Sequence, residues 1–227
     1  MKQERSFGQN KASLRRNAPN STASGRTILV VTEGLKTEPK YLNAVANVLM
    51  IRALDFEIIS PAGTDPITLT KKAIELRQTR LKDSKTTRLV KYDEVWVCLD
   101  LEKPNDIRHQ QYQQALQLPG AGNIKFAVSY PCFEFWLLLH FKYSTAPQAC
   151  CDDMLTEVKK HLPDYVKNET PKLDYDRYVP IAVRHAEKIR QHHATAGNIP
   201  ESNPSTGVDK LIESMNAASR EDNRFVF

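Results

Sequence analysis

Three acidic residues follow apolar segments that have the composition of buried strands. Glu33 comes directly after the apolar run at residues 27–32, and Asp100 and Glu102 follow the run at residues 94–99. Functional sites in a parallel α/β sheet form beyond the carboxyl ends of the strands, so we expect these side chains to meet there. Carboxylates that converge repel one another unless a cation neutralises them. Oxygen ligands favour Mg²⁺ or Mn²⁺, which suggests chemistry on a phosphodiester.

Four neighbouring residues are candidates for supporting roles. Glu38 either caps the helix that follows or supports Glu33, and Glu134 lies in the first turn of a later helix, where the helix dipole favours an anion. Lys36 and Lys103 flank the acidic residues and could hold a phosphate. The alternative interpretation is that these polar residues belong to solvated loops and helix ends.

Strand patterns alternate with helical patterns over the first two thirds of the chain, which predicts an α/β fold. The predicted architecture is a mainly parallel four-stranded sheet with helices on both faces. After about residue 145 the sequence shows helical patterns and no strand pattern. We therefore expect an α/β domain at 26–145 and a helical extension at 146–227 that packs on it. The expected strands are 27–32, 56–60, 94–99 and 124–129, and the expected late helices are 152–161, 174–194 and 205–217.

Composition limits the class of protein. The 227 residues are 41% hydrophobic, which suffices for a packed core, and no apolar run is long enough for a membrane span. The four cysteines have no disulfide-framework spacing, so we expect a reduced, cytoplasmic protein. Residues 1–25 carry a net charge of +4 and almost no apolar side chains, which predicts a disordered basic tail. Such a tail either contacts phosphates or is only a solvated terminus.

Four segments resemble a known family. "VVTEGLKTEPKYL", "VWVCLDLEKPND", "VSYPCFEFWLLLHF" and "NPSTGVDKLIE" resemble the RloB-like family, and the Glu-Gly and Asp-x-Glu strand ends resemble the Toprim domain. The resemblance implies a Toprim-type, Rossmann-like fold and a Mg²⁺-dependent nuclease of bacterial phage defence that acts on DNA or RNA. It also implies that Glu33 is a general acid/base or metal ligand, and that Asp100 and Glu102 are paired metal ligands.

Two positions depart from that pattern. The resemblance leads us to expect Asp where this chain has Glu102, and a basic residue where it has Leu101. These departures support an alternative, a catalytically weak nucleic-acid-binding or adaptor subunit that acts with a partner ATPase. A Rossmann-like nucleotide binder is disfavoured, because Glu-Gly and not a Gly-rich phosphate loop follows the first strand.

Overall fold

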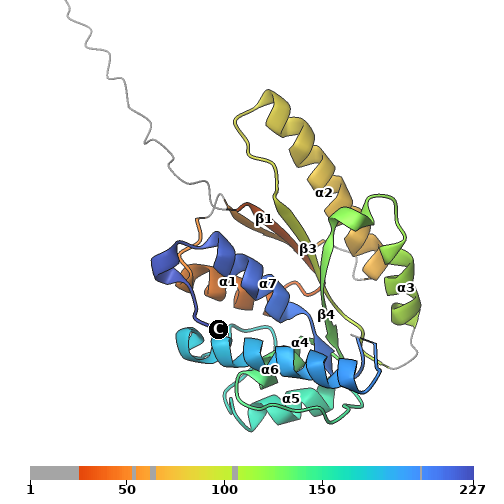
Figure 1. The fold of residues 1–227 in the computed structure, drawn as a ribbon, viewed down its shortest axis with the longest axis vertical. Coiled ribbons are helices and arrows are strands. Elements are labelled where there is room, and N and C mark those ends of the chain that lie inside the picture. Colours follow the sequence, from red (N-terminus) through yellow and green to blue (C-terminus); the bar gives the residue numbers. More distant parts are fainter. Residues whose placement is uncertain (1–25, 53–54, 62–64, 104–106, 200) are drawn as a thin grey trace, which may run out of the picture.

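A five-stranded sheet forms the centre of the protein (Figure 1). The computed structural model describes residues 26–52, 55–61, 65–103, 107–199 and 201–227. The strand order is β2-β1-β3-β4-β5; the first four strands are parallel, and β5 pairs antiparallel with β4. The strands are β1 (Ile28–Thr32), β2 (Phe56–Ile59), β3 (Glu94–Asp100), β4 (Lys125–Tyr130) and β5 (Ser205–Thr206).

The predicted α/β class and mainly parallel sheet are confirmed, but the predicted number of four strands is wrong. The fifth strand consists of Ser205 and Thr206, which pair with Tyr130 and Ser129. A segment of two polar residues is too short to show a strand pattern, so sequence periodicity could not reveal this strand. The helix expected at 205–217 accordingly begins later, at Val208.

Helices cover both faces of the sheet. Helices α2 and α3 lie on one face, and α1, α4, α6 and α7 lie on the other (Figure 1). The sheet therefore has an apolar core on each side. The helices are α1 (Thr37–Val48), α2 (Pro66–Thr86), α3 (Ile107–Leu116), α4 (Phe133–Leu139), α5 (Cys151–Lys159), α6 (Tyr175–Thr195) and α7 (Val208–Ala218), with 3₁₀ turns at Ala121–Asn123 and Glu221–Asn223.

Strand β1 shows why the apolar runs are continuous. Ile28 and Val30 are fully buried in the core beneath α1 and α4, whereas Leu29 and Val31 are fully buried in the core beneath α2. Successive side chains of a strand point to opposite faces, so a strand covered on both sides needs an apolar residue at every position. The sheet that carries the candidate acidic residues is thus held from both faces.

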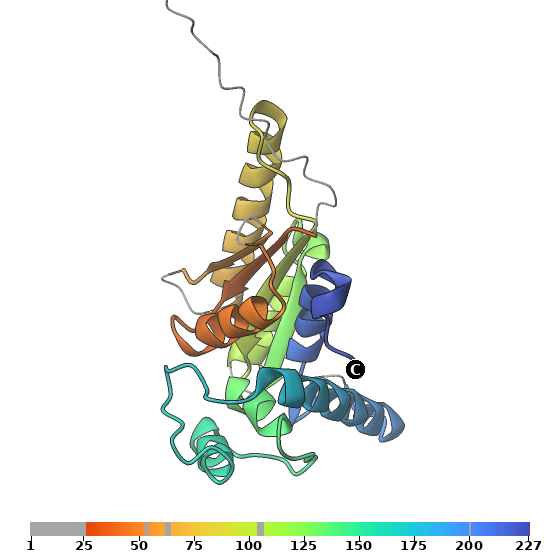
Figure 2. The same ribbon diagram turned by 90° about the vertical axis from the view of Figure 1, so that its left-hand side faces the viewer.

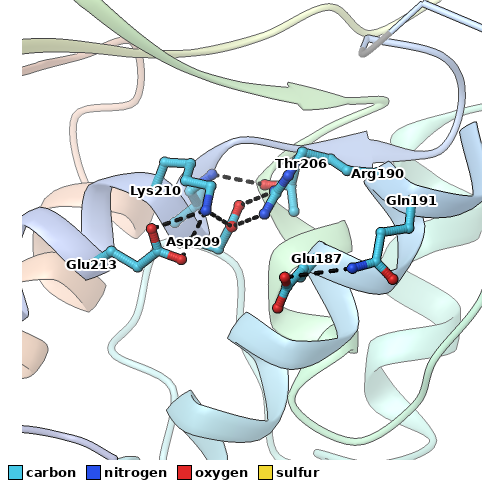
Figure 3. Close-up of polar contacts among 8 residues, drawn as sticks. Glu187, Arg190, Gln191, Thr206, Asp209, Lys210 and Glu213 are labelled. Carbon is cyan, nitrogen blue, oxygen red and sulfur yellow. Dashed lines mark hydrogen bonds and ion pairs between the residues drawn. The ribbon is translucent and has the colours of Figure 1, made fainter. Parts of the chain in front are cut away.

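A buried ion pair connects the last two long helices (Figure 3). Asp209, in the first turn of α7, is fully buried, and its Oδ1 accepts a hydrogen bond of 2.7 Å from Arg190 Nη1 of α6. The second guanidinium nitrogen, Nη2, lies 2.6 Å from Asp209 Oδ2. Burial raises the pKa of Asp209, and the Arg190 guanidinium opposes that rise. The pair fixes α6 against the start of α7.

Several expectations stay predictions. The basic tail at 1–25 lies outside the described residues. None of the helices in the described part of the chain is long and apolar enough to cross a membrane. The division at residue 145 and the cytoplasmic location also stay predictions.

Candidate functional site

Five acidic side chains surround one pocket at the carboxyl edge of the sheet. The pocket has a volume of about 170 Å³. The remaining wall comes from the turn after β1, the starts of α1, α4 and α5, and the loop between α5 and α6. The acidic lining residues are Glu33, Glu38, Asp100, Glu102 and Glu134; the others are Gly34, Thr37, Cys132, Phe133, Cys151, Lys167 and Asn168.

Parallel pairing of β1 with β3 brings the first acidic residues together. Thr32 is in register with Cys98, and the Glu33 backbone N–H donates to the carbonyl of Cys98 at 3.0 Å. The Glu33 side chain then reaches across to β3, where its Oε2 accepts a hydrogen bond of 3.1 Å from the backbone N–H of Asp100. The two residues therefore leave neighbouring strands at the same end and share one site.

Glu33 is placed to exchange a proton near neutral pH. Burial raises the pKa of Glu33 to about 7, although the Arg108 guanidinium and the N–H of Asp100 both favour its charged form. The carboxylates of Glu102 and Glu38 add to the rise. A general acid or base works best when its pKa lies near the working pH.

Arg108 is a site residue that the sequence analysis missed. Its Nη2 forms an ion pair with Glu33 Oε2, and its Nε donates to the carbonyl oxygen of Asp100 at 2.9 Å. Arg108 lies in the second position of α3, a polar helix whose sequence carries no signal of a site. It fixes the Glu33 carboxylate beside β3.

Leu101 points away from the pocket. Its side chain is fully buried in the core between the sheet and helices α2 and α3. Residues on either side of it, Asp100 and Glu102, line the pocket, as expected of alternating side chains. The basic residue expected at position 101 is thus replaced by an apolar one, and Arg108 provides a positive charge next to Glu33 instead.

Asp100 is the most confined of the acidic residues. Burial raises the pKa of Asp100 well above its usual value, and the carboxylates of Glu38, Glu33 and Glu134 raise it further. Burial likewise raises the pKa of Glu38, to which Glu134 contributes. The carboxylates around this pocket therefore repel one another, and the repulsion raises the pKa values of Asp100 and Glu38.

The glycine after Glu33 makes room for Glu38. A Cβ atom added to Gly34 would lie 1.9 Å from Glu38 Oε2. The Gly34 backbone also hydrogen-bonds the Glu38 carboxylate, which favours its charged form. The Glu-Gly pair thus lets a second carboxylate, from the first turn of α1, lie against the turn that carries the first.

Glu102 has a left-handed backbone. Its φ is 59°, and its N–H donates to the carbonyl of Pro131 at 2.8 Å. Among residues other than glycine, Asn and Asp adopt this conformation most readily. The Asp expected at this position would be under less strain than Glu, whose longer side chain also reaches farther into the pocket.

The positive charge of the pocket comes from an unexpected lysine. Lys36 and Lys103 are exposed and are not among the residues that line the pocket. Lys167 lines it, with Nζ 3.9 Å from Glu134 Oε1. Burial opposes the charge of Lys167, but Glu134 and neighbouring groups raise its pKa overall. Its loop is anchored by Asn168, whose N–H donates to Thr37 Oγ1 at 3.0 Å.

The donor set fits a hard cation in charge and chemistry. Five carboxylates line the pocket, and carboxylate oxygens are the ligands that Mg²⁺ and Mn²⁺ prefer. Two positive side chains offset part of their charge, Arg108 next to Glu33 and Lys167 near Glu134. Within the described ranges, however, no three His, Cys, Asp or Glu side chains already stand at metal-ligand spacing. A cation would have to draw these side chains inward.

Comparison with known proteins adds the family. A family model described as RloB-like protein matches residues 28–215, a range that contains every residue lining the pocket. A search of the curated proteins found no match.

Proposed function

The chain belongs to the RloB-like family, and on that premise we propose that it is a nuclease with a Toprim-type domain. Its substrate is DNA or RNA, its cofactor is Mg²⁺ or Mn²⁺, and its setting is bacterial defence against phage. The observation that supports this proposal is the group of acidic side chains around one pocket at the carboxyl edge of the sheet.

Each residue of the site has a separate role in the proposed reaction. Asp100 and Glu102 would hold the cation, with Glu33 as third ligand or as general base. When bound, the cation supplies polarisation of a phosphoryl oxygen and stabilises the leaving oxygen. As general base, Glu33 would take a proton from the attacking water. Arg108 positions Glu33, and Lys167 offers a positive charge to a phosphate on the open side of the pocket.

A basic arm supports nucleic acid as the partner. Residues 66–91 hold eight Lys and Arg residues against Glu75 and Asp83. They comprise α2 and the segment that returns to β3, and α2 projects past the end of the sheet (Figure 2). Arg80 Nε donates to the carbonyl of Val90 at 2.7 Å and so holds the returning segment against the helix. We call residues 77–91 the basic arm.

The charge of the basic arm suits a phosphate backbone. Lys82, Lys85, Arg88 and Lys91 are exposed, so their charges face solvent. A row of cations attracts nucleic acid without regard to sequence, and each phosphate contact releases counterions. The arm extends from the amino ends of the strands, whereas the pocket lies at their carboxyl ends, so a substrate held by both would run along the length of α2.

Removing three charges from the basic arm is expected to weaken nucleic-acid binding. The variant Lys82→Ala/Lys85→Ala/Arg88→Ala should lower the slope of log K against log [salt] by about 3 for duplex DNA, since each phosphate contact contributes about 0.9. Fluorescence anisotropy at several salt concentrations measures this slope. The control is Lys159→Ala/Lys172→Ala/Lys188→Ala, which removes three exposed charges elsewhere. Equal slopes for the two variants would contradict a role for the arm.

The nuclease proposal is tested by cleavage of labelled oligonucleotides. We expect single- or double-stranded DNA or RNA to be cut in the presence of Mn²⁺ or Mg²⁺, and not with a chelator. Asp100→Asn keeps the size of the side chain and removes a ligand charge, so the rate should fall at least about 100-fold. Titration calorimetry should show Mn²⁺ binding by the parent protein and not by Asp100→Asn. Cleavage that is equal in both proteins would reject the proposal.

The second candidate is a nucleic-acid-binding or adaptor subunit that acts with a partner ATPase. It is favoured by the left-handed backbone at Glu102 and by the lack of ligand spacing among the described acidic residues. This candidate predicts binding of nucleic acid that depends on the basic arm, without cleavage and without Mn²⁺ binding. The same two measurements therefore separate the candidates.

A further inference from the structure

Two thiols line the carboxylate pocket and have no role in the proposed nuclease chemistry. Cys132 is the residue before α4, and Cys151 is the first residue of α5. Both line the pocket, and their thiols lie within hydrogen-bonding reach of each other. Neither is in a disulfide. The pair brings together two helix starts that are 19 positions apart in the sequence.

We propose that Cys132 and Cys151 are an oxidant-sensitive pair that forms a reversible disulfide in the wall of the carboxylate pocket. Cys151 is partly exposed and meets the oxidant first, whereas Cys132 is 1% exposed and acts as the resolving thiol. The oxidant class is a hydroperoxide, and a small thiol or dithiol reverses the reaction. This inference goes beyond the proposed function and does not depend on it.

The surroundings of Cys151 favour the thiolate, which is the reactive form. The hydrogen bond from Cys132 lowers the pKa of Cys151, and Lys167 acts in the same direction. Burial and the carboxylates of Glu134 and Glu102 oppose these two effects, but the pKa of Cys151 is lowered overall. Cys151 also stands at the amino end of a nine-residue helix, whose dipole stabilises a negative charge. The same hydrogen bond, together with burial, raises the pKa of Cys132. The two thiols thus differ in the way that a nucleophile and a resolving thiol require.

The reaction balances with hydrogen peroxide as the only oxidant. The Cys151 thiolate attacks one peroxide oxygen, the O–O bond breaks, and the hydroxide that leaves becomes water on taking a proton. Cys151 is then a sulfenic acid. The Cys132 sulfur attacks the Cys151 sulfur and displaces the hydroxyl group, which leaves as a second water with the Cys132 proton. Two thiols and one peroxide give one disulfide and two waters.

Cys150 provides a matched control within the chain. It is adjacent to Cys151 and similarly exposed, but it is not among the residues that line the pocket. Position in the pocket, rather than exposure alone, should therefore decide which thiol reacts. A disulfide from Cys132 to Cys151 closes a loop of about 20 residues, and by restraining the unfolded chain it should raise the melting temperature by up to roughly 10 °C.

The test is peroxide treatment of the full-length chain, followed by thiol counting and peptide mass spectrometry without reduction. We expect the parent and Cys150→Ser each to lose two thiols, to yield the peptide pair joined through Cys132 and Cys151, and to recover both thiols with dithiothreitol. Cys132→Ser should stop at a sulfenic acid on Cys151 that dimedone traps, and Cys151→Ser should keep its Cys132 thiol.

Three results would overturn the proposal: an unchanged thiol count in the parent, a disulfide that uses Cys150, or the same oxidation in Cys151→Ser as in the parent. Circular dichroism of each variant before treatment shows whether it is folded, and Cys132→Ala replaces Cys132→Ser if the buried hydroxyl disturbs the fold. None of these measurements uses nuclease activity, so their failure is distinct from failure of the proposed function.

Discussion

Replacing Arg108 by Gln is expected to lower the rate of cleavage at pH 7 on the order of 100-fold. Burial already raises the pKa of Glu33 to about 7, and Arg108 is the strongest of the groups that oppose this rise. Without the guanidinium the pKa rises further, and each additional unit reduces the ionised fraction of Glu33 about tenfold. The ion pair that holds Glu33 against β3 is lost as well. Rates at low, subsaturating Mn²⁺ measure the effect, because protons then compete with the cation for the Glu33 carboxylate.

The dependence of the cleavage rate on pH shows whether Arg108 acts through the pKa of Glu33. Glu33 acts as ligand or base only when ionised, so at subsaturating Mn²⁺, where most sites hold no cation, the rate of the parent should rise with pH through about 7. The rising limb of Arg108→Gln should lie at higher pH, and much of the lost activity should return above that limb. Arg108→Lys keeps the charge and should show a smaller shift, while Glu33→Gln should stay inactive at every pH. A variant profile that is lower but unshifted would contradict this role for Arg108.

The sequence was sufficient to predict the sheet and its acidic edge for a specific physical reason. Strands buried on both faces, such as β1, are apolar at every position and stand out against their polar surroundings. Parallel strands end at one edge, so acidic residues that follow two of them are placed together by topology alone. Glu33 and Asp100 meet in the pocket for this reason.

The partners of those acidic residues could not be predicted in the same way. Arg108 reaches Glu33 from a helix that is polar throughout, and Lys167 reaches the pocket from a loop between two helices. Neither contact leaves a periodic signal, because each depends on how distant segments pack. Lys36 and Lys103 are close to the acidic residues in sequence, which is the reason to expect them at the site, but they lie outside the pocket lining.

Leu101 is an apolar core residue at a position where the family resemblance predicts a basic one. The sequence comparison treats it as a missing positive charge, whereas strand alternation places the side chain in the opposite core. Its burial contributes to the packing of α2 and α3 on the sheet. The charge that position 101 lacks is present in the structure, but on Arg108.

The largest effect on stability is expected from Arg190→Met. This substitution keeps an unbranched side chain but leaves the Asp209 carboxylate, which is fully buried, without its guanidinium partner. Breaking a buried pair costs about 3–5 kcal/mol. The lower end applies here, because the Arg190 side chain is 26% exposed and Lys210 Nζ remains 4.0 Å from Asp209. We expect a loss of about 3 kcal/mol in the free energy of unfolding, or a melting temperature lower by about 6–12 °C.

The pH dependence distinguishes loss of the pair from loss of packing. Burial raises the pKa of Asp209, and the Arg190 guanidinium opposes that rise in the parent protein. Without the guanidinium, in Arg190→Met, the pKa of Asp209 in the folded state lies further above its unfolded value than in the parent. A group with a raised folded-state pKa favours folding at low pH and loses that contribution as pH rises through the folded-state pKa. The destabilisation should therefore be smaller at pH 5 than at pH 7. Adding Asp209→Asn to Arg190→Met should restore part of the stability at pH 7. A destabilisation that is equal at both pH values and unchanged by Asp209→Asn would show that Arg190 acts through packing alone.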